Sequence, residues 1–125
     1  FVRAAQPVWE ADAAHEDAAA VFFDADRDGD ADLLVVGGGS AAPAGSELYR
    51  PRLYLNDGKG NYSRSPDALP KITESHAAVA VYDFDADGDD DVFLGGGCVP
   101  QAYPKIPQSS VLRNDNGRFQ DVTNQ

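Results

Sequence analysis

The chain carries short runs of apolar, β-branched and aromatic residues, separated by clusters of Gly, Asn, Asp and Pro. Runs of this length, bounded by turn-forming residues, are typical of β-strands. They predict eight strands, at residues 18–23, 33–37, 51–55, 61–65, 77–82, 92–95, 110–114 and 118–123. Helical periodicity is weak, and only the Ala-rich stretch at 10–20 could hold a helical turn. The pattern therefore predicts an all-β chain.

Two copies of one pattern account for all eight strands, and equivalent positions such as Asp24 and Asp83 lie 59 residues apart. In each copy the first strand leads into an aspartate-rich loop, the second ends in three glycines, and the third runs into an Asn-Asp turn. The glycine triplets, at 37–39 and 95–97, indicate a tight bend or a close approach of two backbones, because glycine has no Cβ. The Asn-Asp turns predict tight hairpins, since Asn, Asp and Gly tolerate positive φ.

Four-stranded units at this period are typical of β-propeller blades. We predict a single domain of residues 1–125 with two four-stranded antiparallel blades, at 18–66 and 77–123. Residues 1–6 resemble the last strand of each copy, which predicts the closing strand of a preceding blade. A closed ring needs roughly 4 to 8 blades, so we expect either further blades or self-association of copies through open blade edges.

The negative charge of the chain is concentrated in two short windows. The chain carries 21 acidic and 10 basic side chains, a formal net charge of −11. Eleven of the acids lie at residues 24–32 and 83–91, and the rest of the chain is nearly balanced. A nucleic-acid backbone or an anionic membrane surface repels so acidic a chain, which argues against both as partners. No apolar run approaches the roughly 18 residues of a spanning helix, so we expect no membrane insertion.

Each acidic window has Asp at positions 1, 3, 5, 7 and 9 and glycine at position 6. Alternate side chains of such a tight loop point inward, and Gly29 and Gly88 permit the sharp turn. Calcium prefers six to eight hard oxygen ligands; we expect position 7 to offer its backbone carbonyl and position 9 to close the shell. We predict two calcium ions per chain, bound by Asp24, Asp26, Asp28, Asp30 and Asp32 in the first loop and by Asp83, Asp85, Asp87, Asp89 and Asp91 in the second.

The alternatives to calcium are weaker. Carboxylates about 5 Å apart repel by roughly 0.8 kcal/mol per pair in water, which disfavours an ion-free loop with converging side chains. A solvated acidic turn with its side chains splayed outward is the simpler reading, but the repeated spacing argues against it. Magnesium is a poorer match, because it keeps several waters and takes few protein ligands. Zinc is disfavoured because the sequence has no Cys/His cluster to bind it. Strand sequences follow both loops, so an EF-hand is disfavoured.

The two loops, the strand-Gly-Gly-Gly exits and the Asn-Asp-Gly-x-Gly-x-Tyr hairpin resemble the FG-GAP and VCBS repeats of integrin α-subunits and bacterial surface proteins. The segment at 116–123 is similar to the subgroup found in bacterial proteins like cartilage acidic protein. The resemblance covers essentially the whole chain, although the Phe-Gly and Gly-Ala-Pro motif itself is reduced to the glycine exits. It implies a propeller, usually seven-bladed and secreted or on the cell surface, with mainly structural calcium between the first two strands of a blade. It also implies that ligands bind on loops elsewhere on the ring.

The remaining chemistry-bearing residues predict no active site. His15 and His76 are not equivalent in the repeat, and neither has a serine or cysteine arranged as a nucleophile. Cys98 is the one cysteine and has no basic sequence neighbour to lower its pKa, so we expect an inert residue. The glycine triplets lack the Lys-Ser/Thr pair of a phosphate loop. The stiff loop at 103–107 is the best candidate for a contact surface.

These observations together predict a non-enzymatic, calcium-binding module that mediates adhesion or recognition of a protein or glycan ligand. The alternative is a non-catalytic accessory part of an extracellular polysaccharide-processing enzyme. The resemblance to FG-GAP and VCBS repeats implies an extracellular, periplasmic or cell-surface location, with the signal peptide expected outside this segment.

Overall fold

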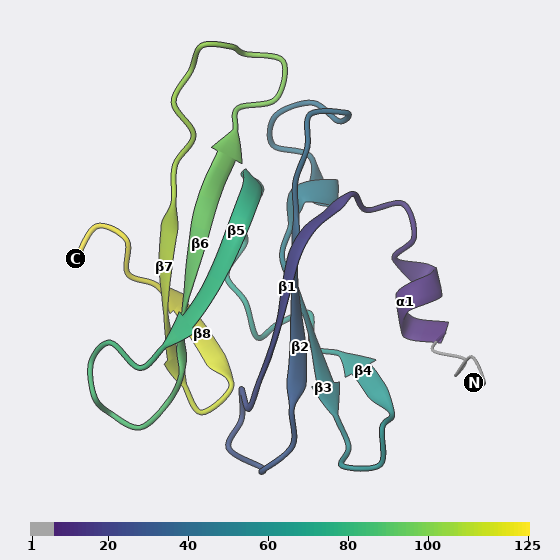
Figure 1. Ribbon diagram of the computed structural model, residues 1–125, viewed down its shortest axis with the longest axis vertical. Helices are drawn as coiled ribbons and strands as arrows, with labels where there is room; N and C mark the ends of the chain where they lie inside the picture. Colours follow the sequence, from purple (N-terminus) through teal and green to yellow (C-terminus); the bar gives the residue numbers. More distant parts are fainter. Residues whose placement is uncertain (1–6) are drawn as a thin grey trace.

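The computed structural model describes residues 7–125, and almost all of its regular structure is β-strand. Eight strands form two four-stranded antiparallel sheets, each with its strands side by side in chain order (Figure 1). Blade 1 consists of β1 (Asp17–Phe23), β2 (Asp32–Gly37), β3 (Arg52–Asn56) and β4 (Tyr62–Arg64), and blade 2 of β5 (Ser75–Tyr82), β6 (Asp91–Cys98), β7 (Ser110–Asp115) and β8 (Arg118–Asp121). The predicted all-β class with two antiparallel blades is confirmed. The closing strand predicted at residues 1–6 lies outside the described residues.

Helical structure in the described residues is limited to α1 (Pro7–Ala11) and the 3-10 turn η1 (Glu47–Tyr49). The sequence allowed a helical turn at residues 10–20, but α1 overlaps that stretch only at Glu10 and Ala11. Proline suits the first position of a helix, where its fixed φ is already helical and its missing N–H is not needed. From Asp17 onward the chain pairs with β2 instead. None of the described helices is long and apolar enough to cross a membrane.

The hydrophobic core lies between the two blades. Neither sheet forms a core alone: the linker between β4 and β5 lies in the same cluster, and the Phe119 amide donates to the Ala68 carbonyl at 2.8 Å. Burial of apolar surface at this single interface is the main force that holds the blades together. The buried apolar residues are Phe23, Ala25, Leu34, Val36 and Leu53 of blade 1, Ala68, Leu69 and Ile72 of the linker, and Val92, Leu94, Leu112 and Phe119 of blade 2.

The glycine triplets allow backbone segments to approach closely, as the sequence predicts. A Cβ added at Gly38 would lie 2.4 Å from the His76 carbonyl oxygen of the other blade, and also 2.4 Å from the Cβ of Ala18. A Cβ added at Gly96 would lie 2.5 Å from the carbonyl oxygen of Gln108. No side chain fits at these distances without displacing backbone, so glycine at these positions sets how closely the strands pass each other.

The two ends of the paired blades differ in their loops (Figure 1). The aspartate-rich loops, which join β1 to β2 and β5 to β6, lie at the lower end of the view. The long β2–β3 and β6–β7 loops lie at the upper end. In the second of these, Tyr103 and Ile106 are 98% and 89% exposed, so the loop predicted as a contact surface is accessible.

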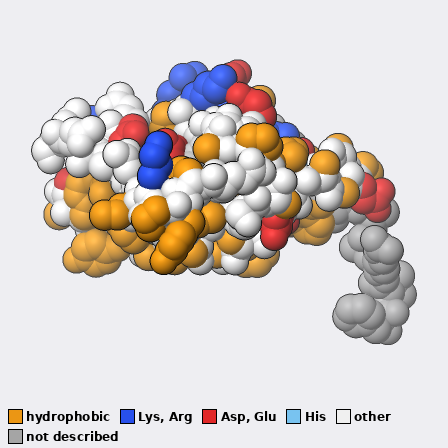
Figure 2. All heavy atoms as spheres, turned by 90° about the horizontal axis from the view of Figure 1, so that it is seen from above, with side chains coloured by type: hydrophobic (Ala, Val, Ile, Leu, Met, Phe, Trp, Pro, Cys, Tyr) orange, Lys and Arg blue, Asp and Glu red, His pale blue; other side chains and the backbone are white. Residues whose placement is uncertain are grey.

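The outer faces of the blades are covered unequally. On blade 1, Trp9 of α1 packs edge-on against Tyr54 and at 5.2 Å from the ring of Tyr62. On blade 2, large apolar side chains are exposed. Seen from above, the molecule as a whole has hydrophobic side chains gathered along its lower left side (Figure 2). Three of the exposed residues, Tyr82, Phe84 and Phe93, have buried counterparts 59 residues earlier in the chain, which are Phe23, Ala25 and Leu34. Blade 2 therefore exposes the positions that blade 1 uses to contact blade 2.

Candidate metal centre

The first aspartate loop is closed by its own carboxylates. Asp24 accepts hydrogen bonds from the amide of Asp28 at 3.2 Å and from that of Gly29 at 3.0 Å. Asp26 accepts from the Asp28 amide at 3.3 Å, and Asp28 accepts from the Asp30 amide at 2.9 Å. Short side chains that accept from the backbone a few residues on are the usual cause of such turns. The alternating aspartates thus fold the loop around their own oxygens.

Two residues of this loop have a left-handed backbone. Gly29 has φ 88°, the conformation that the sequence predicts for it. Arg27 has φ 62°, and its counterpart Ala86 in the second loop has φ 60°. A non-glycine residue in this region costs roughly 1–2 kcal/mol. Both loops have this conformation at the same position, inside the turn that the aspartate hydrogen bonds close.

The last aspartate of each loop is buried and ties the loop to the rest of its blade. Asp32 is 0% exposed; its carboxylate accepts from the amides of Ala25 at 2.9 Å and of Asn56, in β3, at 2.8 Å. Asp91, 1% exposed, accepts from the amides of Phe84 at 3.0 Å and Asn114 at 2.8 Å. These contacts hold one carboxylate under each loop in a fixed place.

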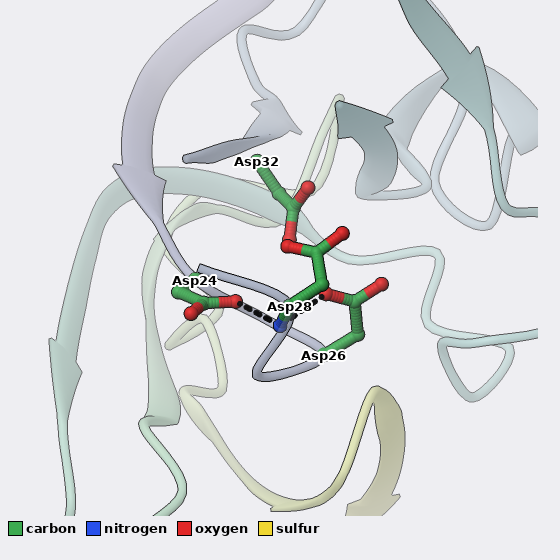
Figure 3. Close-up of side chains that lie close together, drawn as sticks. All are labelled: Asp24, Asp26, Asp28 and Asp32. Carbon is green, nitrogen blue, oxygen red and sulfur yellow. Dashed lines mark hydrogen bonds between the residues drawn. The ribbon is translucent and has the colours of Figure 1, made fainter. Parts of the chain in front are cut away.

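The structure brings four carboxylates of the first loop together. One oxygen from each of them lies within 4.8 Å of the others, and Figure 3 shows the side chains converging on one another from the turn and from the start of β2. The four residues are Asp24, Asp26, Asp28 and Asp32. Such a group could hold a metal ion.

The second loop repeats this backbone geometry. Its amides donate to Asp83, Asp85 and Asp87 at distances from 2.9 to 3.3 Å that match the first loop bond for bond. Here three carboxylates come together within 4.8 Å, from Asp83, Asp85 and Asp91. The carboxylate of Asp87 is outside the group, although its counterpart Asp28 is inside the first one.

The side chains at position 7, Asp30 and Asp89, are in neither group, so any contribution from this position falls to its backbone carbonyl. Asp89 has partners of its own. One oxygen accepts from the Asn116 amide at 2.9 Å, and the other lies 2.6 Å from Nε of Arg27, an ion pair without the alignment of a hydrogen bond. The sequence indicated none of these partners.

Asn56 and Asn114 also have a larger role than the hairpin turns predicted for them. In each blade the backbone N–H of the asparagine donates to the buried aspartate. The side-chain Oδ1 of the same asparagine accepts from a turn amide, which is that of Gly58 at 3.1 Å in blade 1 and that of Gly117 at 2.8 Å in blade 2. The repeated Asn in corresponding positions was the sequence signal for this role. From sequence alone this signal looks the same as the ordinary preference of Asn for turns, and only the contact with the buried aspartate distinguishes the two.

Burial and mutual repulsion act on the carboxylates of the first loop. Burial raises the pKa of Asp26 above its usual range, with further increases from the charges of Asp32 and Asp28. Burial also raises the pKa of Asp32, against the lowering effect of the two amides that it accepts from. Charged carboxylates at this spacing repel by roughly 1 kcal/mol per pair in water and several times that near protein. The loop is therefore a place where a cation lowers the free energy.

The raised pKa of Asp26 gives a testable pH dependence. A carboxyl whose folded pKa is raised contributes stability that is fully present below the unfolded value of about 3.9, and that is lost as pH rises through the folded pKa. With chelator present, Asp26→Asn should raise the melting temperature at pH 7, and the gain should shrink towards pH 4. With a bound cation at pH 7 the same variant should be less stable than wild type. Thermal unfolding of both proteins across this pH range checks the sign; a chelated variant less stable than wild type at pH 7 would contradict it.

The histidines and the cysteine are not assembled into a site among the described residues. The ring of His76 is buried, and this burial lowers its pKa. His15 lies elsewhere, with Nδ1 2.9 Å from the Leu48 carbonyl oxygen. The thiol of Cys98 contacts the carbonyl oxygen of Gly39 at 3.3 Å.

Comparison with known proteins identifies the repeat. A protein-family model described as an FG-GAP-like repeat matches residues 24–94, which is more than half of the chain. The matched stretch begins at the first aspartate of the first loop, contains the whole of the second loop and ends in β6. Searches of curated proteins and of solved structures found no match. The chain belongs to the FG-GAP-like repeat family.

Proposed function

We propose that the chain is a calcium-stabilised pair of propeller blades in an extracellular or surface protein, with a recognition role and no catalytic one. The observation that carries this proposal is the convergence of four carboxylates in the first loop, repeated by three in the second. The FG-GAP family supports the placement, because such repeats occur in extracellular or surface proteins and are generally structural modules.

Calcium fits the donor set of the first loop. Calcium binds six to eight oxygens at 2.3–2.6 Å, so two ligands of one ion lie at most about 5 Å apart. The four carboxylate oxygens of the first loop lie within 4.8 Å of one another, which satisfies this distance. Four carboxylates offer up to eight oxygens of the hard type that calcium prefers. Magnesium requires a tighter octahedron at about 2.1 Å and keeps several waters, which suits this crowded set of protein ligands less well.

The proposed role of the ion is structural. Asp32 accepts from the amides of Ala25 and of Asn56 in β3, and Asp91 makes the same two kinds of contact in blade 2. An ion bound to these carboxylates would connect the turn, the following strand and the next hairpin. It would also neutralise the repulsion that the converging charges create.

The two aspartates Asp28 and Asp30 provide a matched test within one loop. Asp28 lies in the group of four, and Asp30 does not. Asp28→Asn should abolish calcium binding at the first loop or weaken it at least about tenfold, because a charged ligand is lost. Asp30→Asn, which removes the same charge two residues away, should have a much smaller effect. Equal losses in the two variants, measured by calorimetric titration, would refute this assignment of ligands.

The exposed face of blade 2 is the second part of the proposal. Because its exposed aromatic residues occupy the positions that blade 1 buries against blade 2, we propose that this face receives a further blade of the same repeat. In a solution of this chain alone, a second copy supplies that blade. Light scattering should then show concentration-dependent association that Phe93→Ser reduces. A chain that stays monomeric at high micromolar concentration would contradict the self-association.

A further inference from the structure

A chain of hydrogen bonds joins the two aspartate loops through the blade interface. The amide of Ala25 donates to Asp32 at 2.9 Å, and its carbonyl accepts from Nδ2 of Asn114 at 2.9 Å. The amide of Asn114 donates in turn to Asp91 at 2.8 Å. All four residues are at most 1% exposed. The buried carboxylate of each loop is thus connected to the other through one residue of blade 1 and one of blade 2.

A second set of contacts, independent of Asn114, also joins the two loops. Arg27, which stands between two aspartates of the first loop, reaches across to the second. Its Nε lies 2.6 Å from Asp89, and its terminal nitrogen donates to the Asp87 carbonyl at 3.4 Å. The turn of blade 2 also touches the first loop, because a Cβ added at Gly117 would lie 3.1 Å from that of Asp26. A shift of either loop therefore changes contacts made by the other.

We propose that the two calcium sites are energetically coupled, with Asn114 as the residue that positions one site relative to the other. This inference rests on the proposed function. The hydrogen bonds already place each buried aspartate, and an ion at one loop restrains its aspartate further. That restraint passes through Ala25 and Asn114 to the buried aspartate of the other loop. The second ion then binds a loop whose ordering cost has already been met, so it binds more tightly than the first. By thermodynamic linkage the effect is the same in both directions.

Blade 1 contains a matched control for this role. Asn56 is the counterpart of Asn114 and makes the same backbone hydrogen bond to its own buried aspartate, also at 2.8 Å. Nδ2 of each asparagine donates within its own blade at 3.1 Å, that of Asn56 to the Ala31 carbonyl and that of Asn114 to the Asp90 carbonyl. Only Nδ2 of Asn114 has a further acceptor in the other blade, the Ala25 carbonyl. Truncation of either asparagine disturbs one loop, but only Asn114→Ala removes a bond between the blades.

The test is a thermodynamic cycle measured by calorimetric calcium titration. The dissociation constant of the first loop is measured with the second loop intact and with it disabled by Asp83→Asn and Asp85→Asn. The ratio of the two constants is the coupling factor, which we expect to be about fivefold or more in the wild type. It should fall clearly in the Asn114→Ala background, where the contacts of Arg27 remain, and persist unchanged in the Asn56→Ala background. A simple loss of stability would change both constants together and leave their ratio in place.

Arg27→Gln serves as a second variant, because this side chain is about half exposed and its loss does not open the core. It should also lower the coupling factor, and a folded Arg27→Gln protein keeps the test decisive if Asn114→Ala does not fold. Two binding events with a wild-type coupling factor near one would overturn this inference and leave the proposed function standing. Equal coupling factors in the wild type, Asn114→Ala and Arg27→Gln would also overturn it. The absence of any calcium binding would overturn both.

Discussion

Replacing Asp91 with Ala is expected to abolish the second calcium site and to destabilise the fold even when no calcium is present. The carboxylate is 1% exposed and accepts from the amides of Phe84 and Asn114. Its removal leaves the buried N–H of Asn114 and the part-buried N–H of Phe84 without their acceptor, at a cost of up to about 1–3 kcal/mol each. We therefore expect a loss of about 3–5 kcal/mol in the free energy of unfolding, which is a large share of the stability of an ordinary domain.

Chemical denaturation with and without calcium measures this effect. Asp90→Ala is the matched control, because Asp90 is the exposed neighbour of Asp91 and lies outside the carboxylate group. The control should keep two calcium sites and lose little stability, since substitutions at exposed positions usually change it by no more than about 0.5 kcal/mol. If the Asp91→Ala protein retained two sites and unfolded like the control, the assignment of the buried aspartate would be wrong.

Removal of calcium from the wild-type protein should lower its melting temperature substantially. A ligand that binds only the folded state at about 100 times its dissociation constant adds about 2.7 kcal/mol, so two sites add about 5 kcal/mol. For a domain of this size that corresponds to a shift of at least about 10 °C. Part of the effect is the relief of repulsion among the converging aspartates, which persists in the calcium-free protein at neutral pH.

Thermal unfolding followed by circular dichroism, in millimolar calcium and again in excess chelator, gives this shift directly. Magnesium at the same concentration is the control, and it should restore much less of the lost stability because it retains its waters. The Asp28→Asn variant should lose about half of the calcium-dependent shift. Identical melting temperatures in calcium and in chelator would be incompatible with a structural ion.

The local features of this fold could be predicted from the sequence because both copies of the repeat carry the same pattern of residues. Strand positions follow from apolar runs bounded by turn residues, and the close backbone approach at Gly38 and Gly96 follows from glycines placed at strand exits. The alternating aspartates identified the residues from which both carboxylate groups are formed. In each case the signal lies within a few residues of the structure that it determines.

The contacts between blades could not be predicted in the same way. Asn114 and Ala25 are 89 positions apart, and the hydrogen bond between them depends on how the two blades pack. Arg27 looks like an incidental loop residue until the second loop is placed beside it. The different placement of Asp28 and Asp87, at equivalent positions, likewise has no basis in the pattern, because both loops have the same spacing.

The most direct test of the central claim is a calorimetric calcium titration of the chelator-stripped protein. We expect two calcium ions per chain, with dissociation constants between micromolar and millimolar, as is common for extracellular modules. Each ion should be assignable to one loop, because Asp28→Asn should affect the first and Asp91→Ala the second. A protein that binds no calcium at millimolar concentration would contradict the claim that these aspartate loops are calcium sites.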